Sequence, residues 1–326
     1  MRTEQSIWTW GDRRIGWSFQ GPAETPSETD ESDTTKAQAD VAVLLIHGFG
    51  ANTNHWRFNQ PALAALTPTF AIDLLGFGRS DQPRARLKDE AETPDSTHYG
   101  FDLWGEQVAD FCREVINQPV LLVGNSIGGV VALRAAQLLE ADPSTSPCQG
   151  VVLIDCAQRL MDDKQLSTQP AWMAWIRPLL KTLVRQRWLS TALFRNAARP
   201  GVIRTVLKQA YPSGSNIDDA LIELLYGPTQ REGAAEAFRG FINLFDDHLA
   251  PQLMQTLQSP VDLIWGERDP WEPLPEARRW ANSIDCVESL QVISGAGHCP
   301  HDEAPDQVNK ALTDILARQF DNHPKP

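Results

Sequence analysis

Short runs of apolar residues recur along the chain, and segments with helical periodicity separate most of them. The runs have the length of buried strands and are too short for buried helices. The predicted strands are Val41–Ile46, Phe70–Asp73, Val120–Val123, Val151–Ile154, Val261–Trp265 and Val287–Ile293. The predicted helices are Trp56–Leu66, Asp102–Asn117 with Asp102 as N-cap, Val130–Leu139, Pro275–Ser283 and Glu303–Arg318. This alternation predicts an α/β protein with a mostly parallel, doubly wound sheet.

Three segments depart from the alternation. Ser6–Trp10 and Arg14–Phe19 flank Gly11-Asp12 and predict an antiparallel hairpin. Residues 21–40 are polar and acidic with almost nothing apolar, so we expect a disordered loop. Residues 158–248 contain no strand pattern and several prolines, which indicates an inserted helical cap. We therefore expect a core built from 1–157 and 249–326.

Composition narrows the class of protein. The chain has 326 residues, and its net charge of −13 argues against general binding of nucleic acid. Its apolar runs fall short of the roughly 20 residues that span a membrane, and its first residues lack the apolar core of a signal peptide. The cysteines are scattered without a CxxC motif. We expect a cytoplasmic protein with reduced thiols.

The most informative stretch follows the strand Val120–Val123. It runs from Gly124 through Ser126 to Gly128, matches G-x-S-x-G, and leads into the helix Val130–Leu139. Strand, sharp turn and helix are the context in which this motif presents a nucleophilic serine. Side chains at the two glycines would clash where the chain turns back on itself. The alternative interpretation is a glycine-rich turn between strand and helix whose serine has no catalytic role.

A nucleophilic serine needs a base and an acid that orients it. Asp269 follows one predicted strand and His298 follows another, so the order Ser126, Asp269, His298 is that of α/β-hydrolases. The carboxyl ends of parallel strands share one edge of a sheet, where the three side chains can meet. Asp155 and Glu267 are alternative acids.

Each of these residues has a predicted role. His298 takes the proton of Ser126 and later protonates the leaving group, while Asp269 holds the imidazole tautomer and stabilises its cation. The oxyanion needs two backbone donors. We expect them to be the N–H groups of Ile127, which follows the nucleophile, and Phe49, in the loop after an earlier strand.

With these motifs in place, the chain resembles the α/β-hydrolase superfamily outside residues 21–40. The resemblance rests on the segments HGFG, DLLGFGRS, GNSIGG, WGERDP and GAGHCPHDEAP. The segments HGFGANTNHWR and DLLGFGRSD are most similar to those of plastid and cyanobacterial hydrolases of the pheophytinase and chlorophyll-dephytylase kind. That resemblance implies hydrolysis of a large apolar ester. The Gly-Asn-Ser tripeptide also resembles that of C–C hydrolases of meta-cleavage products.

The predicted cap carries an apolar stripe beside a basic one. We expect a substrate pocket walled by Asn125, Trp172, Trp175, Leu179, Leu183 and Phe194. The basic residues are Arg177, Lys181, Arg185 and Arg187, and no Asp or Glu occurs between 165 and 217. Two interpretations remain open: a basic face exposed to solvent, or a peripheral contact with anionic lipid.

The sequence thus predicts a capped serine hydrolase, of carboxylesterase type, that acts on a small apolar ester through an acyl-enzyme. A phytyl ester of a chlorophyll-type pigment is the favoured substrate. We expect no cofactor and no metal, since His298, His301 and Asp302 lack a second cluster of ligands. The alternatives are a C–C hydrolase and a catalytically silent binding protein. The oligomeric state is not predicted.

Overall fold

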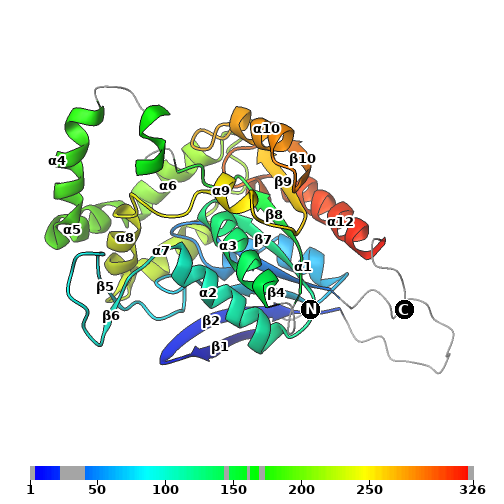
Figure 1. The fold of residues 1–326 in the computed structure, drawn as a ribbon, viewed down its shortest axis with the longest axis horizontal. Helices are drawn as coiled ribbons and strands as arrows, with labels where there is room; N and C mark the ends of the chain where they lie inside the picture. Colours follow the sequence, from blue (N-terminus) through cyan, green and yellow to red (C-terminus); the bar gives the residue numbers. More distant parts are fainter. Residues whose placement is uncertain (1–3, 23–40, 143–146, 160–161, 169–172, 322–326) are drawn as a thin grey trace.

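The computed structural model describes residues 4–22, 41–142, 147–159, 162–168 and 173–321 (Figure 1). Its main sheet has eight strands in the order β1-β2-β4-β3-β7-β8-β9-β10. These are β1 (Glu4–Trp10), β2 (Arg13–Gln20), β3 (Ala42–Ile46), β4 (Thr69–Ile72), β7 (Val120–Asn125), β8 (Cys148–Ile154), β9 (Val261–Gly266) and β10 (Val287–Ile293). β1 and β2 form the predicted hairpin and β2 pairs antiparallel with β4, whereas every later pair is parallel. The mostly parallel sheet is confirmed.

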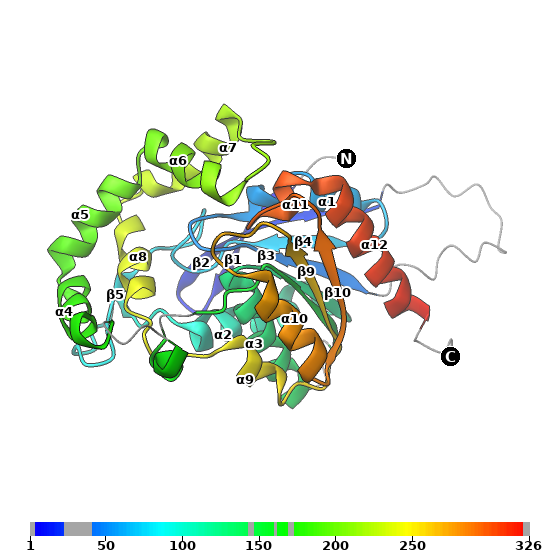
Figure 2. The same cartoon turned by 90° about the horizontal axis from the view of Figure 1, so that it is seen from above.

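Helices cover both faces of this sheet, which explains why the central strands are continuously apolar. Along β3, Leu44 and Ile46 pack toward α2 (Phe101–Phe111) and α3 (Ile127–Ala141). Val43 and Leu45 alternate with them and join the core beneath α1 (Asn59–Ala64) and α12 (Pro305–Asp321). Figure 2 shows these two layers on opposite sides of the sheet.

Further helices complete the two layers. They are α9 (Ala250–Met254), α10 (Leu274–Ser283) and the short α11 (Pro300–Glu303). A 3₁₀ turn at Thr53–Trp56 precedes α1, and a π-helical turn at Cys112–Ile116 ends α2. The predicted N-cap is wrong: Gly100 caps α2, and Asp102 lies in its first turn, where it pairs with Arg134. None of the described helices combines the length and apolar character needed to cross a bilayer.

Between β8 and β9 the described residues form helices rather than strands of the main sheet. They are α4 (Met173–Arg185), α5 (Arg187–Ala197), α6 (Pro200–Ala210), α7 (Asp219–Tyr226) and α8 (Ala234–Ile242). In Figure 2, α4 to α7 form an arc to the left of the sheet. The division into a core (1–157 and 249–326) and a cap (158–248) stays a prediction. Most of the predicted disordered loop at 21–40 lies outside the described residues.

The basic residues of α4 are turned toward acidic partners rather than left to solvent. Arg177 and Lys181 both reach Asp163, at 2.6 and 2.5 Å. Arg185 pairs with Asp89, from the loop that joins the short strands β5 (Arg84–Ala85) and β6 (Ser96–Thr97). The basic residues of α4 are therefore paired with acids from other parts of the chain, which spacing along one helix does not reveal.

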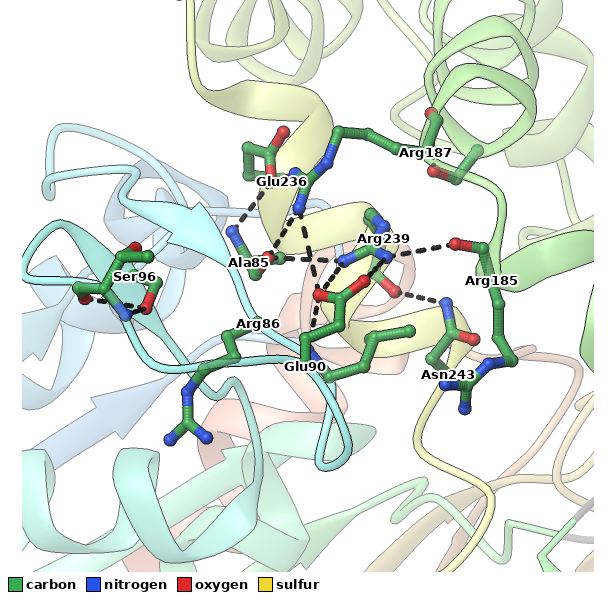
Figure 3. Close-up of polar contacts among 12 residues, drawn as sticks. Ala85, Arg86, Glu90, Ser96, Arg185, Arg187, Glu236, Arg239 and Asn243 are labelled. Atoms are coloured by element: carbon green, nitrogen blue, oxygen red, sulfur yellow. Dashed lines mark hydrogen bonds and ion pairs between the residues drawn. The ribbon is translucent and has the colours of Figure 1, made fainter.

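Where α4, α5 and α8 meet this loop, a cluster of charged residues forms that we call the arginine clasp (Figure 3). It consists of Arg185, Arg187, Arg239, Glu90 and Glu236. Arg239 donates to Glu90 at 2.5 Å and to the carbonyl oxygen of Arg185 at 3.0 Å. Arg187 pairs with Glu236. Because the Arg239 side chain is only 3% exposed, its pairing with Glu90 joins the loop to the helices through a buried charge.

Candidate active site

Ser126 stands in the turn between β7 and α3, with a φ of 55° that residues with side chains rarely adopt. The flanking glycines have a steric reason. A Cβ on Gly124 would lie 2.2 Å from the carbonyl oxygen of Gly128, and one on Gly128 would lie 2.4 Å from that of Ile46. The predicted need for glycine and the strand–turn–helix context are thus confirmed. The role of Ser126 as nucleophile stays a prediction.

His298 and Asp269 come from the loops after β10 and β9, and they meet as expected. Nδ1 of His298 lies 2.8 Å from Oδ2 of Asp269, and both side chains are buried. Burial acts to raise the pKa of Asp269, but the hydrogen bond and charge of His298 and the N–H of Trp271 outweigh it and lower the pKa. An ionised Asp269 occupies Nδ1, so Nε2 is the imidazole nitrogen available for proton transfer.

The two alternative acids, Glu267 and Asp155, form hydrogen bonds with groups other than the imidazole of His298. Glu267 accepts hydrogen bonds from the hydroxyl of Ser294 and the N–H of Gly295, at 2.9 Å each. Asp155 accepts from the N–H of Gly266 at 2.9 Å. The geometry therefore gives the contact with the imidazole to Asp269.

Asn125 ties the elbow to the histidine loop. Its amide Nδ2 lies 3.1 Å from the carbonyl oxygens of both Ile154 and His298. The side chain also lines the cavity described below. Asn125 therefore supports the elbow through defined hydrogen bonds, in addition to its place in the wall of the cavity.

The two predicted oxyanion donors lie on either side of the elbow. Ile127 is the first residue of α3, where a backbone N–H has no partner within the helix. Phe49 follows Gly48, where a side chain would be crowded, because a Cβ there would lie 2.9 Å from Oδ1 of Asn125 and 3.2 Å from Cβ of Ser126. Its ring stacks on Phe241 with centroids 4.1 Å apart. The oxyanion assignment stays a prediction.

His47 supports this loop as a buried, neutral imidazole. Its Nε2 accepts the N–H of Leu74 at 3.0 Å, so Nδ1 carries the proton and donates to the carbonyl oxygen of Gly48 at 2.7 Å. Burial lowers the pKa of His47. The residue therefore shapes the backbone beside the oxyanion turn.

Ser126 and His298 open into one cavity of about 440 Å³. Its walls are largely apolar and come from α5 to α8: Phe194, Ile203, Val206, Leu207, Leu225 and Phe238. No lysine or arginine is among the described residues that line it. Such a cavity has the size and character of a small-molecule site for an uncharged, apolar group.

Only some of the residues predicted to wall the substrate pocket line the cavity. Asn125 and Phe194 line the cavity, whereas Leu179 and Leu183 do not and are 61% and 40% exposed. That part of the prediction is wrong because the stripe they form on α4 faces outward. Trp172 and the side chain of Trp175 lie outside the described residues.

Several lining residues escaped the sequence analysis. Trp271 packs its ring edge-on against His298, with centroids 4.8 Å apart. Ile203, Leu207 and Ala210 recur at helical spacing in α6, and that spacing is the signal that could have found them. Ala210 also accepts the backbone N–H of His298 at 2.9 Å, which ties α6 to the histidine loop.

Glu272 is the one acid among the described lining residues. Its Oε2 accepts the N–H of Gln158 at 2.8 Å. Burial, reinforced by the charge of Asp269, raises the pKa of Glu272 to about 8. At neutral pH this wall therefore carries mostly a neutral carboxylic acid.

The residues beside His298 do not form a metal centre. Asp302 is bound by Arg57 at 2.7 Å and accepts the hydroxyl of Tyr211 at 3.1 Å. His301 contacts His55 at 3.3 Å. Within the described part of the chain there is no group of three or more metal-ligating side chains.

Comparisons with known proteins agree with this architecture. Pheophytinase of Arabidopsis thaliana is 27% identical over 297 residues, covering 82% of this chain and 59% of that protein's length. Epoxide hydrolase 3 of Xenopus tropicalis is 26% identical over 292 residues, covering 85% and 72%. The crystal structure of a serine hydrolase involved in carbazole degradation aligns with a TM-score of 0.67 at 19% identity, covering 97% and 99%. The model of the alpha/beta hydrolase family matches residues 43–311. The chain therefore belongs to the alpha/beta hydrolase family.

Proposed function

We propose that this hydrolase is a serine carboxylesterase that cleaves an apolar ester through an acyl-enzyme. The observation that carries the proposal is the buried His298–Asp269 pair, whose histidine lines, together with Ser126, a cavity with no lysine or arginine among its described lining residues. One relative is named an epoxide hydrolase. For epoxide hydrolysis we would expect an aspartate at the position of the nucleophile. Serine at 126 favours acyl transfer instead.

In the proposed mechanism, Oγ of Ser126 attacks the ester carbonyl carbon while Nε2 of His298 takes its proton. The backbone N–H groups of Phe49 and Ile127 stabilise the oxyanion. The imidazolium, stabilised by Asp269, then protonates the departing alcohol. Water, deprotonated by the same imidazole, attacks the acyl-enzyme, and Ser126 leaves with the proton returned to it.

We further propose that the ester is long and apolar, with a phytyl ester of a chlorophyll-type pigment as the favoured case. Support comes from the apolar cavity and from the similarity to pheophytinase. A C–C hydrolase would need a cation for its substrate's carboxylate. Two arginines of this helical region that could supply such a cation pair with acids instead, Arg177 with Asp163 and Arg204 with Asp219.

The test is a substrate panel of straight-chain esters, chlorophyll, pheophytin and a ring-fission diketone. We expect ester hydrolysis that improves with chain length, and release of phytol from pigment. Cleavage of the diketone without ester hydrolysis would contradict the proposal. Activity on short esters alone would remove the phytyl ester and leave the serine esterase.

We also propose that the protein resides in the cytoplasm and touches membranes peripherally. None of the five cysteines is joined in a disulfide bond, as suits a reducing compartment. On α4 and α5, Leu179, Leu183 and Trp188 are exposed, Trp188 at 70%. Because the neighbouring cations are paired, we expect apolar insertion to dominate over charge.

Vesicle sedimentation tests the membrane contact. We expect the protein to sediment with anionic vesicles, and replacement of the three exposed residues by serine to abolish sedimentation. Leu66→Ser, which removes a leucine 38% exposed elsewhere, is the control. A protein that stays in the supernatant at low salt would contradict the proposal.

A further inference from the structure

Asp155 occupies the junction of three loops of the active site. It follows β8 with a φ of 43°, and its N–H donates to the carbonyl oxygen of Ile264 in β9 at 3.0 Å. Its neighbours hold the elbow: Ser126 N–H donates to the Ile154 carbonyl at 3.0 Å, and Ala157 N–H donates to the Ser126 carbonyl at 3.1 Å. The backbone of Asp155 is thus fixed to the nucleophile strand and to the acid strand.

The side chain of Asp155 is fully buried and has an unusual partner. One carboxyl oxygen accepts the N–H of Gly266 at 2.9 Å. The other receives no N–H or hydroxyl donor from the described residues. The carboxyl group of Asp269 is its neighbour: the same Gly266 accepts the N–H of Asp269 at 3.3 Å through its carbonyl oxygen, and the two carboxyl groups interact with each other. Two carboxyl groups can share a hydrogen bond only when one of them carries a proton.

The surroundings decide which carboxyl group carries that proton. Asp269 receives the N–H of Trp271 at 2.8 Å, the N–H of Glu272 at 3.1 Å and Nδ1 of His298 at 2.8 Å. Three donors stabilise a carboxylate, whereas Asp155 has a single donor and no solvent. Burial and the charge of Asp269 raise the pKa of Asp155 well above its usual range. The proton therefore belongs to Asp155.

We propose that Asp155 is a positioning residue whose protonated carboxyl group donates a hydrogen bond to Asp269 and so holds that carboxylate against His298. The inference rests on the proposed serine-esterase function. Asp155 takes no part in the proton transfers of the reaction. It acts through Asp269, because the added hydrogen bond fixes the carboxylate and lowers its pKa, which keeps the Nδ1 proton on the imidazole.

Two substitutions separate this role from a structural one. Asp155→Asn keeps the shape, and its amide can donate to Asp269 while its carbonyl accepts from Gly266. Asp155→Leu has similar volume but no donor. We expect the asparagine variant to retain kcat within about three-fold, and the leucine variant to lose about 10–100-fold in kcat with KM little changed, as for other residues that orient a catalytic group.

A spectroscopic signature gives a readout independent of turnover. The proton between Nδ1 of His298 and Asp269 should give a far-downfield resonance in the proton NMR spectrum. We expect Asp155→Asn to preserve that resonance and Asp155→Leu to shift or broaden it. Unfolding temperature and circular dichroism establish that each variant is folded, and if the leucine variant is not, the asparagine variant alone decides.

The outcomes separate cleanly. If Asp155→Asn loses activity as severely as a variant of Asp269, then Asp155 acts as a carboxylate and the inference is overturned. A folded Asp155→Leu with wild-type kcat and an unmoved resonance would also overturn it. Failure of the proposed function would look different: Ser126→Ala would keep its ester hydrolysis, whereas the resonance would still respond to Asp155.

Discussion

The apolar cavity beside Ser126 predicts that catalytic efficiency rises with the length of the acyl chain. Going from an acetyl to an octanoyl ester adds six methylenes, each worth about 0.8 kcal/mol when fully buried, so the ceiling is about 5 kcal/mol or more than 10³-fold in kcat/KM. The rim residue Val206 is 43% exposed, so the cavity stays partly open to solvent. With about half of that burial realised, we expect a gain of about 50-fold.

The perturbation is Ile203→Asp, which puts a charge on the α6 wall of the cavity. A charged wall loses the apolar contact with each added methylene. We therefore expect short esters to be affected little and the 50-fold gain to shrink to a few-fold. Val202→Asp is the matched control, because Val202 neighbours Ile203 on the same helix, is similarly half-buried and does not line the cavity.

The assay is kcat/KM for p-nitrophenyl esters of increasing acyl length, measured for the wild type and both variants. The reasoning is refuted by a wild-type profile that is flat or falls with length. It is equally refuted if Ile203→Asp and Val202→Asp show the same slope, since the cavity wall would then play no part in recognising the chain.

Three further predictions concern charged groups. Asp269→Asn should lower kcat by about 10⁴-fold in a folded protein, because it favours the wrong imidazole tautomer. The preference for a neutral ester over a carboxylate-bearing ester of equal length, measured as the ratio of their kcat/KM values, should increase as pH rises through about 8, because Glu272 then ionises and repels the substrate's carboxylate. Glu272→Gln should remove this pH dependence. Glu90→Ala should lower the free energy of unfolding by about 1–3 kcal/mol, because Arg239 is left buried without its acid.

Each of these has a control or a contradicting result. An asparagine at 269 with near wild-type kcat would mean that another acid orients the imidazole. A wild-type ratio independent of pH would show that Glu272 does not face the substrate. For the arginine clasp, Glu92→Gln is the control, since Glu92 is largely exposed and lies 3.9 Å from Arg86. Equal denaturation midpoints for Glu90→Ala and Glu92→Gln would contradict the stabilising role of the clasp.

The core of the fold could be predicted because its signals are local. A parallel strand covered on both faces must be apolar at every position, as Val43 and Leu44 illustrate by packing into opposite layers. The elbow could be predicted in part for the same reason, since the clash that requires glycine at 124 is with Gly128 in the same turn, whereas the clash at 128 is with Ile46 at the end of β3. The N-cap of α2 was missed because Gly100 offers no capping side chain as a signal.

The arrangement of the helices between β8 and β9 could not be predicted at the same level because their packing is set by partners elsewhere in the chain. The stripe containing Leu179 is typical of a buried helix face, yet its direction depends on Arg177 and Lys181 reaching Asp163. Likewise, nothing local to Asp155 reveals that its carboxyl group meets that of Asp269, since the contact joins two separate strand ends. Charge pairing across long sequence separations therefore limits what the pattern alone can show.

The central claim is that Ser126 becomes acylated, and covalent labelling tests it most directly. The wild type and Ser126→Ala are treated with a fluorophosphonate, digested, and mapped by mass spectrometry. We expect one modification, on the peptide that contains Ser126, and no labelling of the alanine variant. Equal labelling of both proteins, or a modified residue elsewhere, would contradict the claim that this serine is the nucleophile.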